Sequence, residues 1–185
     1  VDSDGLLKWS AHNLLTYSEQ FDNAAWSKRG TCAITANDAT APDGTLTADL
    51  VSGLNSSTND LYQTASSLPV GAPYTPSFYI KRVSTSGTLL VDNPAIGTAG
   101  SWSINMALLP DEWVRIERGH AALTIINEHV VSAGGQAGLH FRKTASGALS
   151  FHLWGAQVNF GPTATAYLPT TSAARYDSPR RQWDA

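Results

Sequence analysis

Apolar and polar residues alternate along most of this chain, in short segments separated by Gly, Pro, Asn and Asp. Such segments are typical of strands, in which successive side chains point to opposite faces of a sheet. The pattern predicts strands near 31–36, 46–52, 59–66, 73–83, 87–92, 101–107, 112–118, 121–127, 136–143 and 148–159. Helical periodicity is nearly absent, and the one helical turn that we expect lies near 19–26, with Ser18 as its N-cap. The chain is therefore predicted to be all-β.

The same alternation assigns side chains to the two faces of each strand. Phe78 and Ile80 fall on one face and Tyr79 on the other, and the apolar set of the last long strand is Leu149, Phe151 and Leu153. The outward positions then include several rings, namely Tyr62, Tyr79, Trp113, His152 and Trp154. A bulge at Gly155 would reverse the parity of every residue beyond it.

Length and composition predict one domain with two distinct ends. The chain has 185 residues, close to the size of a single domain. We expect an N-terminal arm at 1–12, a sandwich domain at 13–160 and an extended C-terminal segment at 161–185, which carries a small basic cluster of Arg175, Arg180 and Arg181. This segment is expected either to pack as a strap, to reach a neighbouring subunit or to remain a solvated tail.

Charge and cysteine usage exclude several classes of protein. Lys and Arg number 12 against 15 Asp and Glu, which does not fit a nucleic-acid-binding surface. No apolar run approaches the ~18 residues of a membrane-spanning helix, so we expect no membrane insertion. The single cysteine, Cys32, cannot form an internal disulfide, and we expect it to be a buried, inert thiol.

The catalytic and metal-binding motifs that we tested are absent. The chain has no phosphate-binding glycine loop, no G-x-S-x-G segment and no H-E-x-x-H segment. Its five histidines show no tight metal-ligand spacing, and Glu112 and Glu117 have opposite strand parity, which separates them as a catalytic pair. We therefore expect no enzyme, no metal and no cofactor.

Aromatic residues supply the remaining functional signal. Six Trp and six Tyr are many for a chain in which only 15% of residues are charged. Rings on a rigid sheet can stack on sugars, and the candidate carbohydrate-binding residues are Tyr62, Tyr79, Trp113 and His152. The alternative is that these rings lie in a core or a subunit interface, because a sandwich can bury both faces of a sheet.

Six segments occur in an order that resembles a known family. They are NLLTYSEQFDNAAWSK at 13–28, ATAPDGTLTADLV at 39–51, LYQTASSLPVGAPYTPSFYIKR at 61–82, EWVRIE at 112–117, LWGAQVNFGPTATAYLPTT at 153–171 and ARYDSP at 174–179. As an ordered set they resemble the phage head spike fibre or tail fibre domain family, which is similar to jelly-roll carbohydrate-binding modules. The resemblance covers 13–179.

This resemblance implies a jelly-roll β-sandwich of two antiparallel sheets with extended N- and C-terminal arms. It implies a bacteriophage virion structural protein, as a head spike or fibre, a capsid decoration or a tail fibre component, that displays a host-glycan-binding jelly roll on the virion surface. The implied partners are capsid, portal or tail proteins, further copies in a homo-oligomer such as a trimer, and a host surface polysaccharide. The alternative is a carbohydrate-binding module of a larger protein or enzyme, with no virion role.

The resemblance also bears on individual residues. It assigns Trp26, Trp113 and Trp154 to segments of the scaffold, and it leaves Tyr62, Tyr79 and His152 as the less scaffold-like candidates. Related modules often hold a structural calcium beside a Phe-Glu pair near the N-terminus. This chain has the order Glu19-Gln20-Phe21-Asp22 instead, so no metal is expected.

Overall fold

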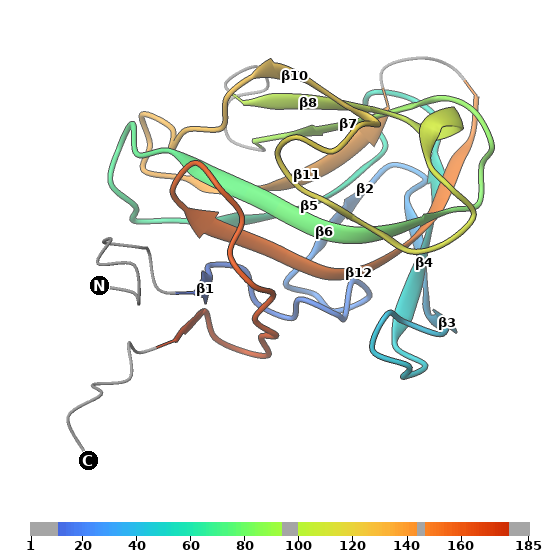
Figure 1. Cartoon of the computed structure of the whole chain (residues 1–185), viewed down its shortest axis with the longest axis horizontal. Coiled ribbons are helices and arrows are strands. Elements are labelled where there is room, and N and C mark those ends of the chain that lie inside the picture. Colours follow the sequence, from blue (N-terminus) through green and yellow to red (C-terminus); the bar gives the residue numbers. More distant parts are fainter. Residues whose placement is uncertain (1–10, 94–99, 144–146, 178–185) are drawn as a thin grey trace.

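The computed structural model describes residues 11–93, 100–143 and 147–177, and in these residues the chain forms 13 strands and one short 3-10 helix (Figure 1). The first strands are β1 (His12–Asn13), β2 (Ser27–Arg29), β3 (Ala33–Ala39), β4 (Ala48–Leu54), β5 (Asp60–Ala65) and β6 (Tyr74–Arg82). They are followed by β7 (Thr88–Asp92), β8 (Ser101–Asn105), the 3-10 helix (Met106–Leu108), β9 (Val114–Ile116), β10 (Leu123–Asn127), β11 (Ala137–Lys143), β12 (Leu149–Phe160) and β13 (Arg175–Tyr176).

The strands form two large antiparallel sheets and one small one. The six-stranded sheet has the order β10-β8-β7-β11-β5-β2, and the five-stranded sheet has the order β3-β4-β12-β6-β9. β1 and β13 pair with each other and bring the first and last described residues together at one end of the molecule (Figure 1). The all-β, two-sheet class predicted for the chain is confirmed.

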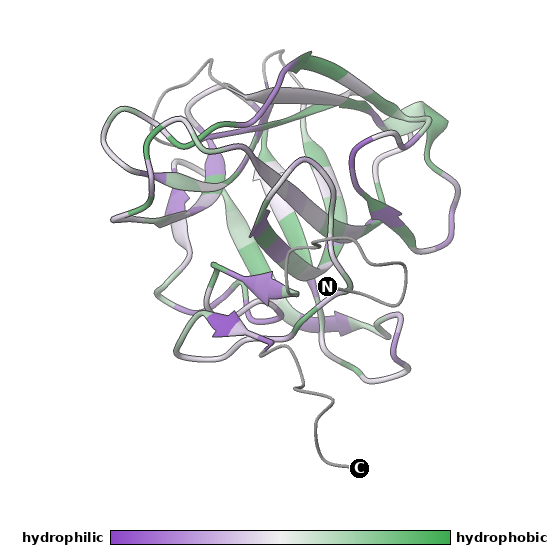
Figure 2. Ribbon diagram, turned by 60° about the vertical axis from the view of Figure 1, so that its left-hand side comes forward, coloured by the Kyte–Doolittle hydropathy of each residue, from purple (hydrophilic) through white to green (hydrophobic). Residues whose placement is uncertain are grey.

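The inner faces of the two large sheets enclose one hydrophobic core. Hydrophobic stretches lie mainly on the long strands of these sheets, and hydrophilic stretches lie at their margins (Figure 2). Phe141 of the six-stranded sheet contacts Phe78 and Phe151 of the five-stranded sheet, with ring centroids 4.9 and 5.9 Å apart. All three side chains are fully buried, as alternation predicted for Phe78 and Phe151.

Each of the ten predicted strand regions contains a strand, whereas the predicted helical turn is wrong. Residues 19–26 form a series of tight turns in which the Asn23 and Trp26 N–H groups donate to carbonyls three residues earlier. Ser18 does not cap a helix. Its hydroxyl oxygen accepts the N–H of Thr170, which lies far along the chain.

β12 contains the irregularity that Gly155 made a risk. Its pairing with β6 shifts register between Trp154 and Gln157, and Gly155 has a φ of +62°, which favours glycine. Leu153 faces the core before the bulge, and Ala156 and Val158 face it afterwards, so the parity reverses as expected.

The described part of the C-terminal segment, 161–177, forms an extended strap over the outer face of β12. Gln157 holds it from below, because its side-chain amide donates to Thr165 Oγ1 and accepts the N–H of Leu168. Asn13 ties the strap to the sheet by donating to the carbonyls of Ala156 and Leu168. Of the predicted basic cluster, Arg175 is exposed, while Arg180 and Arg181 lie outside the described residues, as does the predicted N-terminal arm up to residue 10.

Cys32 lies at the margin of the core, where its side chain is half-buried. Loss of hydration raises the pKa of the Cys32 thiol to about 11, and the nearby Asp60 carboxylate adds to the effect. The thiol is therefore protonated at neutral pH and a poor nucleophile.

Candidate functional site

The four predicted ligand residues do not lie together. Tyr62 is on the outer face of the six-stranded sheet, on β5. Tyr79, Trp113 and His152 lie over the outer face of the five-stranded sheet, on or beside β6, β9 and β12. The structure therefore offers two separate outer faces.

The aromatic side chains of the five-stranded face contact one another. Trp154 lies 5.4 Å from Tyr79 and 5.0 Å from Tyr167 of the strap, measured between ring centroids. The Trp113 indole N–H donates to the carbonyl of Thr40 at 2.8 Å. These rings form a small second hydrophobic cluster, completed by Ala41 and Ala48, and much of their surface is used within the chain.

His152 also has a partner within the chain. Its Nε2 lies 2.8 Å from the Asp38 carboxylate, and its ring centroid is 6.4 Å from that of Trp113. On this side, His152 and the neighbouring rings are therefore engaged with other groups of the chain. The outward parity predicted from the sequence is right, and the role of these residues in sugar binding stays a prediction.

The outer face of the six-stranded sheet carries two rows of polar side chains, which the strand register sets out. The first row runs from Arg29 on β2 through Asp60 on β5 to Arg142 on β11. The second row contains Ser27, Tyr62, His140, Asp92 and Ser101, on five neighbouring strands. Directly opposed side chains in such a ladder are about 5 Å apart and diagonal neighbours about 7–8 Å, so long side chains of the two rows can reach one another.

Five of these residues form a chain of contacts, which we call the charged array: Arg29, Asp60, His140, Asp92 and Arg142. Arg29 donates to both Asp60 oxygens, at 2.7 Å from Nε and 2.5 Å from Nη2. The His140 ring lies between the two carboxylates, with Nε2 3.1 Å from Asp60 and Nδ1 2.6 Å from Asp92. Arg142 donates from Nε to Asp92 at 2.6 Å and closes the array at the other end.

Burial makes the charged array unusual for an outer sheet face. The side chains of Asp60 and Asp92 have no exposed surface, whereas the side chains of Arg29 and Arg142 are 56% and 20% exposed. Two buried carboxylates are costly unless each is paired and hydrogen-bonded. The His140 contacts are short, yet the orientation of the ring does not meet hydrogen-bond geometry, so the guanidinium groups provide the directional bonds.

Tyr62 adds an aromatic ring to this face. The Arg29 guanidinium stands over the Tyr62 ring, 4.9 Å from its centroid, and the His140 ring meets it edge-on at 5.5 Å. The resulting surface combines a half-buried ring with N–H donors whose positions are fixed by buried carboxylates. Such a surface is suited to holding a polar ligand with hydroxyl groups.

Alternation along the sequence predicted Tyr62 as an outward residue and did not predict the charged array around it. A signal was present, because Asp60 and Tyr62 share a parity in DLYQTA, and His140 and Arg142 share one in GLHFRK. The parity shows that each pair points away from the core on one face of its strand. The pairing of β5 with β11 and β7, which brings them together, is set by the register of distant strands.

A small cavity of about 200 Å³ includes the acidic residues Glu19, Asp22 and Asp49 in its lining. Burial raises the pKa of Asp49, whose carboxylate accepts the N–H groups of Phe21 and Asn37. Among the described residues, no group of three His, Cys, Asp or Glu side chains is arranged to hold a metal ion. The described residues also include no helix with the length and apolar character needed to cross a membrane.

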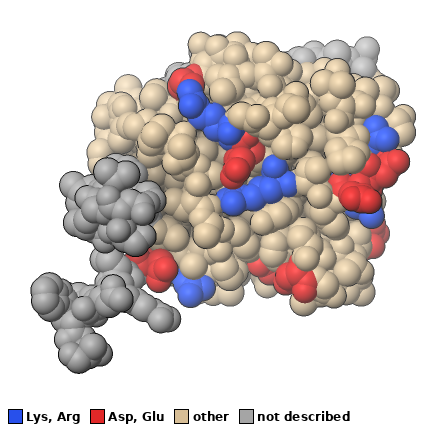
Figure 3. Space-filling model, in the orientation of Figure 1, with Lys and Arg blue, Asp and Glu red and all other residues tan. Residues whose placement is uncertain are grey.

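On the face seen in Figure 3, positive and negative residues lie next to each other in small groups, and large uncharged areas separate these groups. This view shows no continuous basic surface of the kind that follows a nucleic-acid backbone. The arrangement agrees with the formal net charge of -3.

No family model matches the chain, and no curated protein matches it either. Among solved structures it is similar to the enzymatically active domain of tailspike protein 4 of bacteriophage CBA120, with 15% identity over 80% of this chain and a TM-score of 0.51. It is equally similar to the CBM22-1–CBM22-2 tandem domain of Paenibacillus barcinonensis Xyn10C, with 15% identity over 86% of this chain and a TM-score of 0.51. The chain spans 21% of the length of the tailspike structure and 49% of the tandem domain.

These similarities establish the fold, which is the jelly roll found in carbohydrate-binding modules. At 15% identity they show the fold alone. The same fold occurs in a phage tailspike domain and in a CBM22 tandem domain, so it does not single out a phage fibre family. Membership of that family remains a prediction from the ordered sequence segments.

Proposed function

We propose that this protein is a carbohydrate-binding module whose ligand lies on the outer face of the six-stranded sheet, over Tyr62 and the charged array. One observation carries the proposal. Polar groups that point away from the core are held in place before any ligand arrives, because Asp60 and Asp92 are buried beneath the guanidinium groups of Arg29 and Arg142. Donors that are already ordered lose little conformational entropy when a sugar hydroxyl binds to them.

Binding, rather than catalysis, is the proposed activity of this face. A glycosidase needs one carboxyl group that can give up a proton to the leaving oxygen and one that is free to act as base or nucleophile. Asp60 and Asp92 are instead buried and each is held by a guanidinium group. An assay for new reducing ends on the polysaccharides that the protein retains tests this part, and their appearance would contradict it.

The direct test is affinity electrophoresis in gels that contain xylan, mixed-linked β-glucan or bacterial capsular polysaccharide. Tyr62→Ala and Arg29→Ala are expected to weaken retention at least tenfold, about 1.4 kcal/mol. Tyr79→Ala is the matched control, because it removes a tyrosine from the other outer face. Thermal unfolding of each variant excludes loss of the fold as the cause.

Two outcomes contradict the proposal. Retention that depends on Tyr79 and not on Tyr62 would place the site on the five-stranded face. Absence of retention in all three polysaccharides would argue against glycan binding by this face as a whole.

A virion role is a second proposal, favoured by the ordered segments between 13 and 179. It predicts a homo-oligomer, such as a trimer, that associates with capsid, portal or tail proteins on the virion surface. Light scattering of the purified chain measures its mass in solution. A trimer or larger closed oligomer would favour a fibre or spike, and a monodisperse monomer would favour a binding module of a larger protein.

A further inference from the structure

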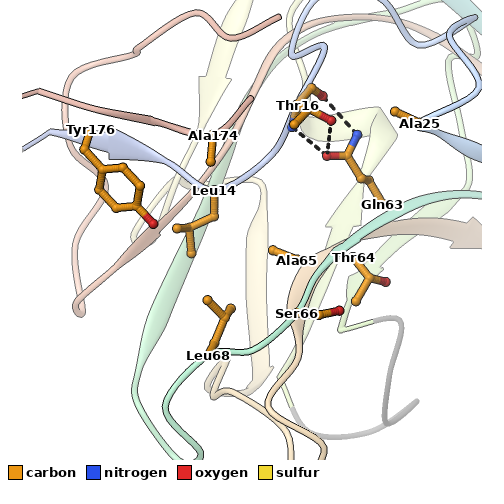
Figure 4. Close-up of a pocket in the computed structure, with 10 residues that line it drawn as sticks. All are labelled: Leu14, Thr16, Ala25, Gln63, Thr64, Ala65, Ser66, Leu68, Ala174 and Tyr176. Carbon is orange, nitrogen blue, oxygen red and sulfur yellow. Dashed lines mark hydrogen bonds between the residues drawn. The ribbon is translucent and has the colours of Figure 1, made fainter. Parts of the chain in front are cut away.

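A cavity of about 350 Å³ lies at the edge of the six-stranded sheet, where β5 continues past the end of β2 (Figure 4). We call it the edge pocket. Its walls are Thr64 to Ser66 of the β5 segment, Thr16 near the N-terminal end and Ala174 and Tyr176 near the C-terminal end. The volume falls within the range of small-molecule sites in proteins.

The lining is uncharged and mixes apolar and hydroxyl groups. Leu14, Leu68 and three alanines supply the apolar part, while the hydroxyl groups come from Thr16, Thr64, Ser66 and Tyr176. A charged ligand would lose hydration in this pocket without meeting an opposite charge among the residues that line it. A sugar ring fits this chemistry, because it carries hydroxyl groups at its edge and C–H groups on its faces.

One wall of the edge pocket is fixed by a pair of reciprocal hydrogen bonds. The Thr16 N–H donates to Gln63 Oε1 at 2.6 Å, and the Gln63 amide donates back to the Thr16 carbonyl at 2.9 Å. Figure 4 shows these bonds at the side of the pocket nearest Ala25. The glutamine amide is satisfied by the protein, so the wall holds its shape without a ligand.

The other wall offers backbone hydrogen-bonding groups. β11 pairs with β5 over the whole range Asp60–Ala65, whereas β2 pairs with β5 only over Asp60–Tyr62. Among the described residues, Gln63–Ala65 therefore has no strand partner on the side of β5 that pairs with β2 at Asp60–Tyr62. Since alternate residues of a strand direct their N–H and C=O groups to the same side, at least one residue presents both groups there.

The edge pocket lies beside Tyr62, which adjoins the charged array. Thr64 is the next residue after Tyr62 on the same face of β5, about 7 Å along the strand. Ala25 also lines the pocket, and it lies two residues before Ser27, the cross-strand partner of Tyr62. A glycan that lies over Tyr62 can therefore reach the pocket without leaving the surface.

We propose that the edge pocket binds one neutral sugar residue, as a subsite for the glycan that lies on the charged array. The claim that the pocket is a subsite for this glycan rests on the proposed function. The claim that the pocket binds an uncharged sugar ring can be measured independently of the proposed function.

The test follows backbone amide shifts of Ala25, Thr64 and Ala174 by NMR during titration with methyl β-glucoside, methyl β-xyloside and methyl β-galactoside. Methyl glucuronide is the charged comparison. Ala174 is exposed and lines the pocket, so Ala174→Trp fills it from the rim without entering the core. Ala173→Trp is the matched control, because Ala173 is also exposed and does not line the pocket.

We expect saturable shifts with at least one neutral glycoside in the native chain and in Ala173→Trp, at least tenfold weaker binding in Ala174→Trp, and weaker binding of the glucuronide. Absence of saturable shifts with all three neutral sugars, or shifts unaltered by Ala174→Trp, would overturn the inference. Equal or tighter binding of the glucuronide would overturn the assignment to neutral sugars.

Failure of the proposed function has a different signature. If polysaccharide retention depends on Tyr62 and Arg29 but not on Ala174→Trp, the glycan site stands and the edge pocket is not part of it. If the glycosides shift the pocket amides while no polysaccharide is retained, the pocket is a sugar site and the role of the charged array fails.

Discussion

Acid is expected to destabilise this protein through one buried histidine, His129. Its side chain is enclosed by Trp102 and Tyr74, with ring centroids 4.9 and 5.2 Å away, and neither ring nitrogen has a hydrogen-bond partner among the described residues. Burial lowers the pKa of His129 from 6.5 to about 4, although Asp92 and Glu128 act in the opposite direction. The folded protein thus keeps this imidazole neutral at pH values where the unfolded chain would protonate it.

The sign and size of the effect follow from this pKa difference. The unfolded chain binds a proton at His129 near pH 6.5 and the folded chain only near pH 4, so stability is full above pH 6.5 and falls as the pH decreases to 4. Each pKa unit is worth about 1.36 kcal/mol, which gives a loss of about 3 kcal/mol over this window. Below pH 4 both states are protonated and His129 causes no further loss.

Urea unfolding at pH 7, 6, 5 and 4 measures this effect when the native chain is compared with His129→Phe. Phenylalanine has a similar shape and cannot be protonated, and it replaces two unpaired nitrogens, so we expect little change at pH 7. At pH 4 the variant is expected to be the more stable of the two by about 3 kcal/mol. Parallel loss of stability in both proteins would refute the reasoning, because the titration would then belong to other groups.

Three further predictions concern the fold and use urea unfolding as the measurement. Gly155→Ala is expected to cost more than Gly44→Ala: both glycines have positive φ, but a Cβ at 155 would lie 3.1 Å from Tyr79, while one at 44 meets nothing within 4 Å. Equal costs would show that backbone strain is the whole effect. Phe141→Ala is expected to cost about 3–5 kcal/mol, since it empties the centre of the core, and a cost below 1 kcal/mol would contradict the packing described. Asn13→Ala is expected to cost about 2–3 kcal/mol and to increase amide exchange in 161–171, because a buried side chain that holds the strap is lost; unchanged exchange would separate Asn13 from the strap.

The long strands could be predicted because each one directs apolar residues to the core and mostly polar residues to the opposite face. The alternation in β6 and β12 reflects this division, and it also placed Phe78 and Phe151 in the core. β1, β2 and β13 contain only two or three residues, too few to alternate, and their pairing depends on partners far along the chain.

The turn region 19–26 shows how tertiary contacts override local preference. Its sequence has the spacing of a helical turn, yet Phe21 and Trp26 are buried against each other, with ring centroids 4.9 Å apart. The Phe21 N–H donates to the buried Asp49 carboxylate of β4, at 2.8 Å. No pattern within eight residues reveals a partner 28 positions away.

The aromatic residues illustrate the limit of counting side chains of one type. Rings are abundant in the sequence, and the structure uses most of those on the five-stranded face to cover that face with its own cluster. On the six-stranded face, Tyr62 lies among charged residues that give no signal when each is considered alone. Strand register decides which residues become neighbours, and it cannot be read from one strand alone.

The charged array and the core depend on the same register. A slip of one residue between β11 and β5 would turn His140 and Arg142 towards the core and bring Phe141 to the surface, so every correctly folded molecule carries the array. Changes to the buried carboxylates must then affect stability and binding together. Arg29→Ala leaves the buried Asp60 without its guanidinium partner, so it is expected to lower stability as well as retention. Tyr62→Ala separates the two effects, because Tyr62 lies on the same face without belonging to the charged array. A loss of glycan retention in Tyr62→Ala with the fold intact would therefore report on the surface that a ligand touches.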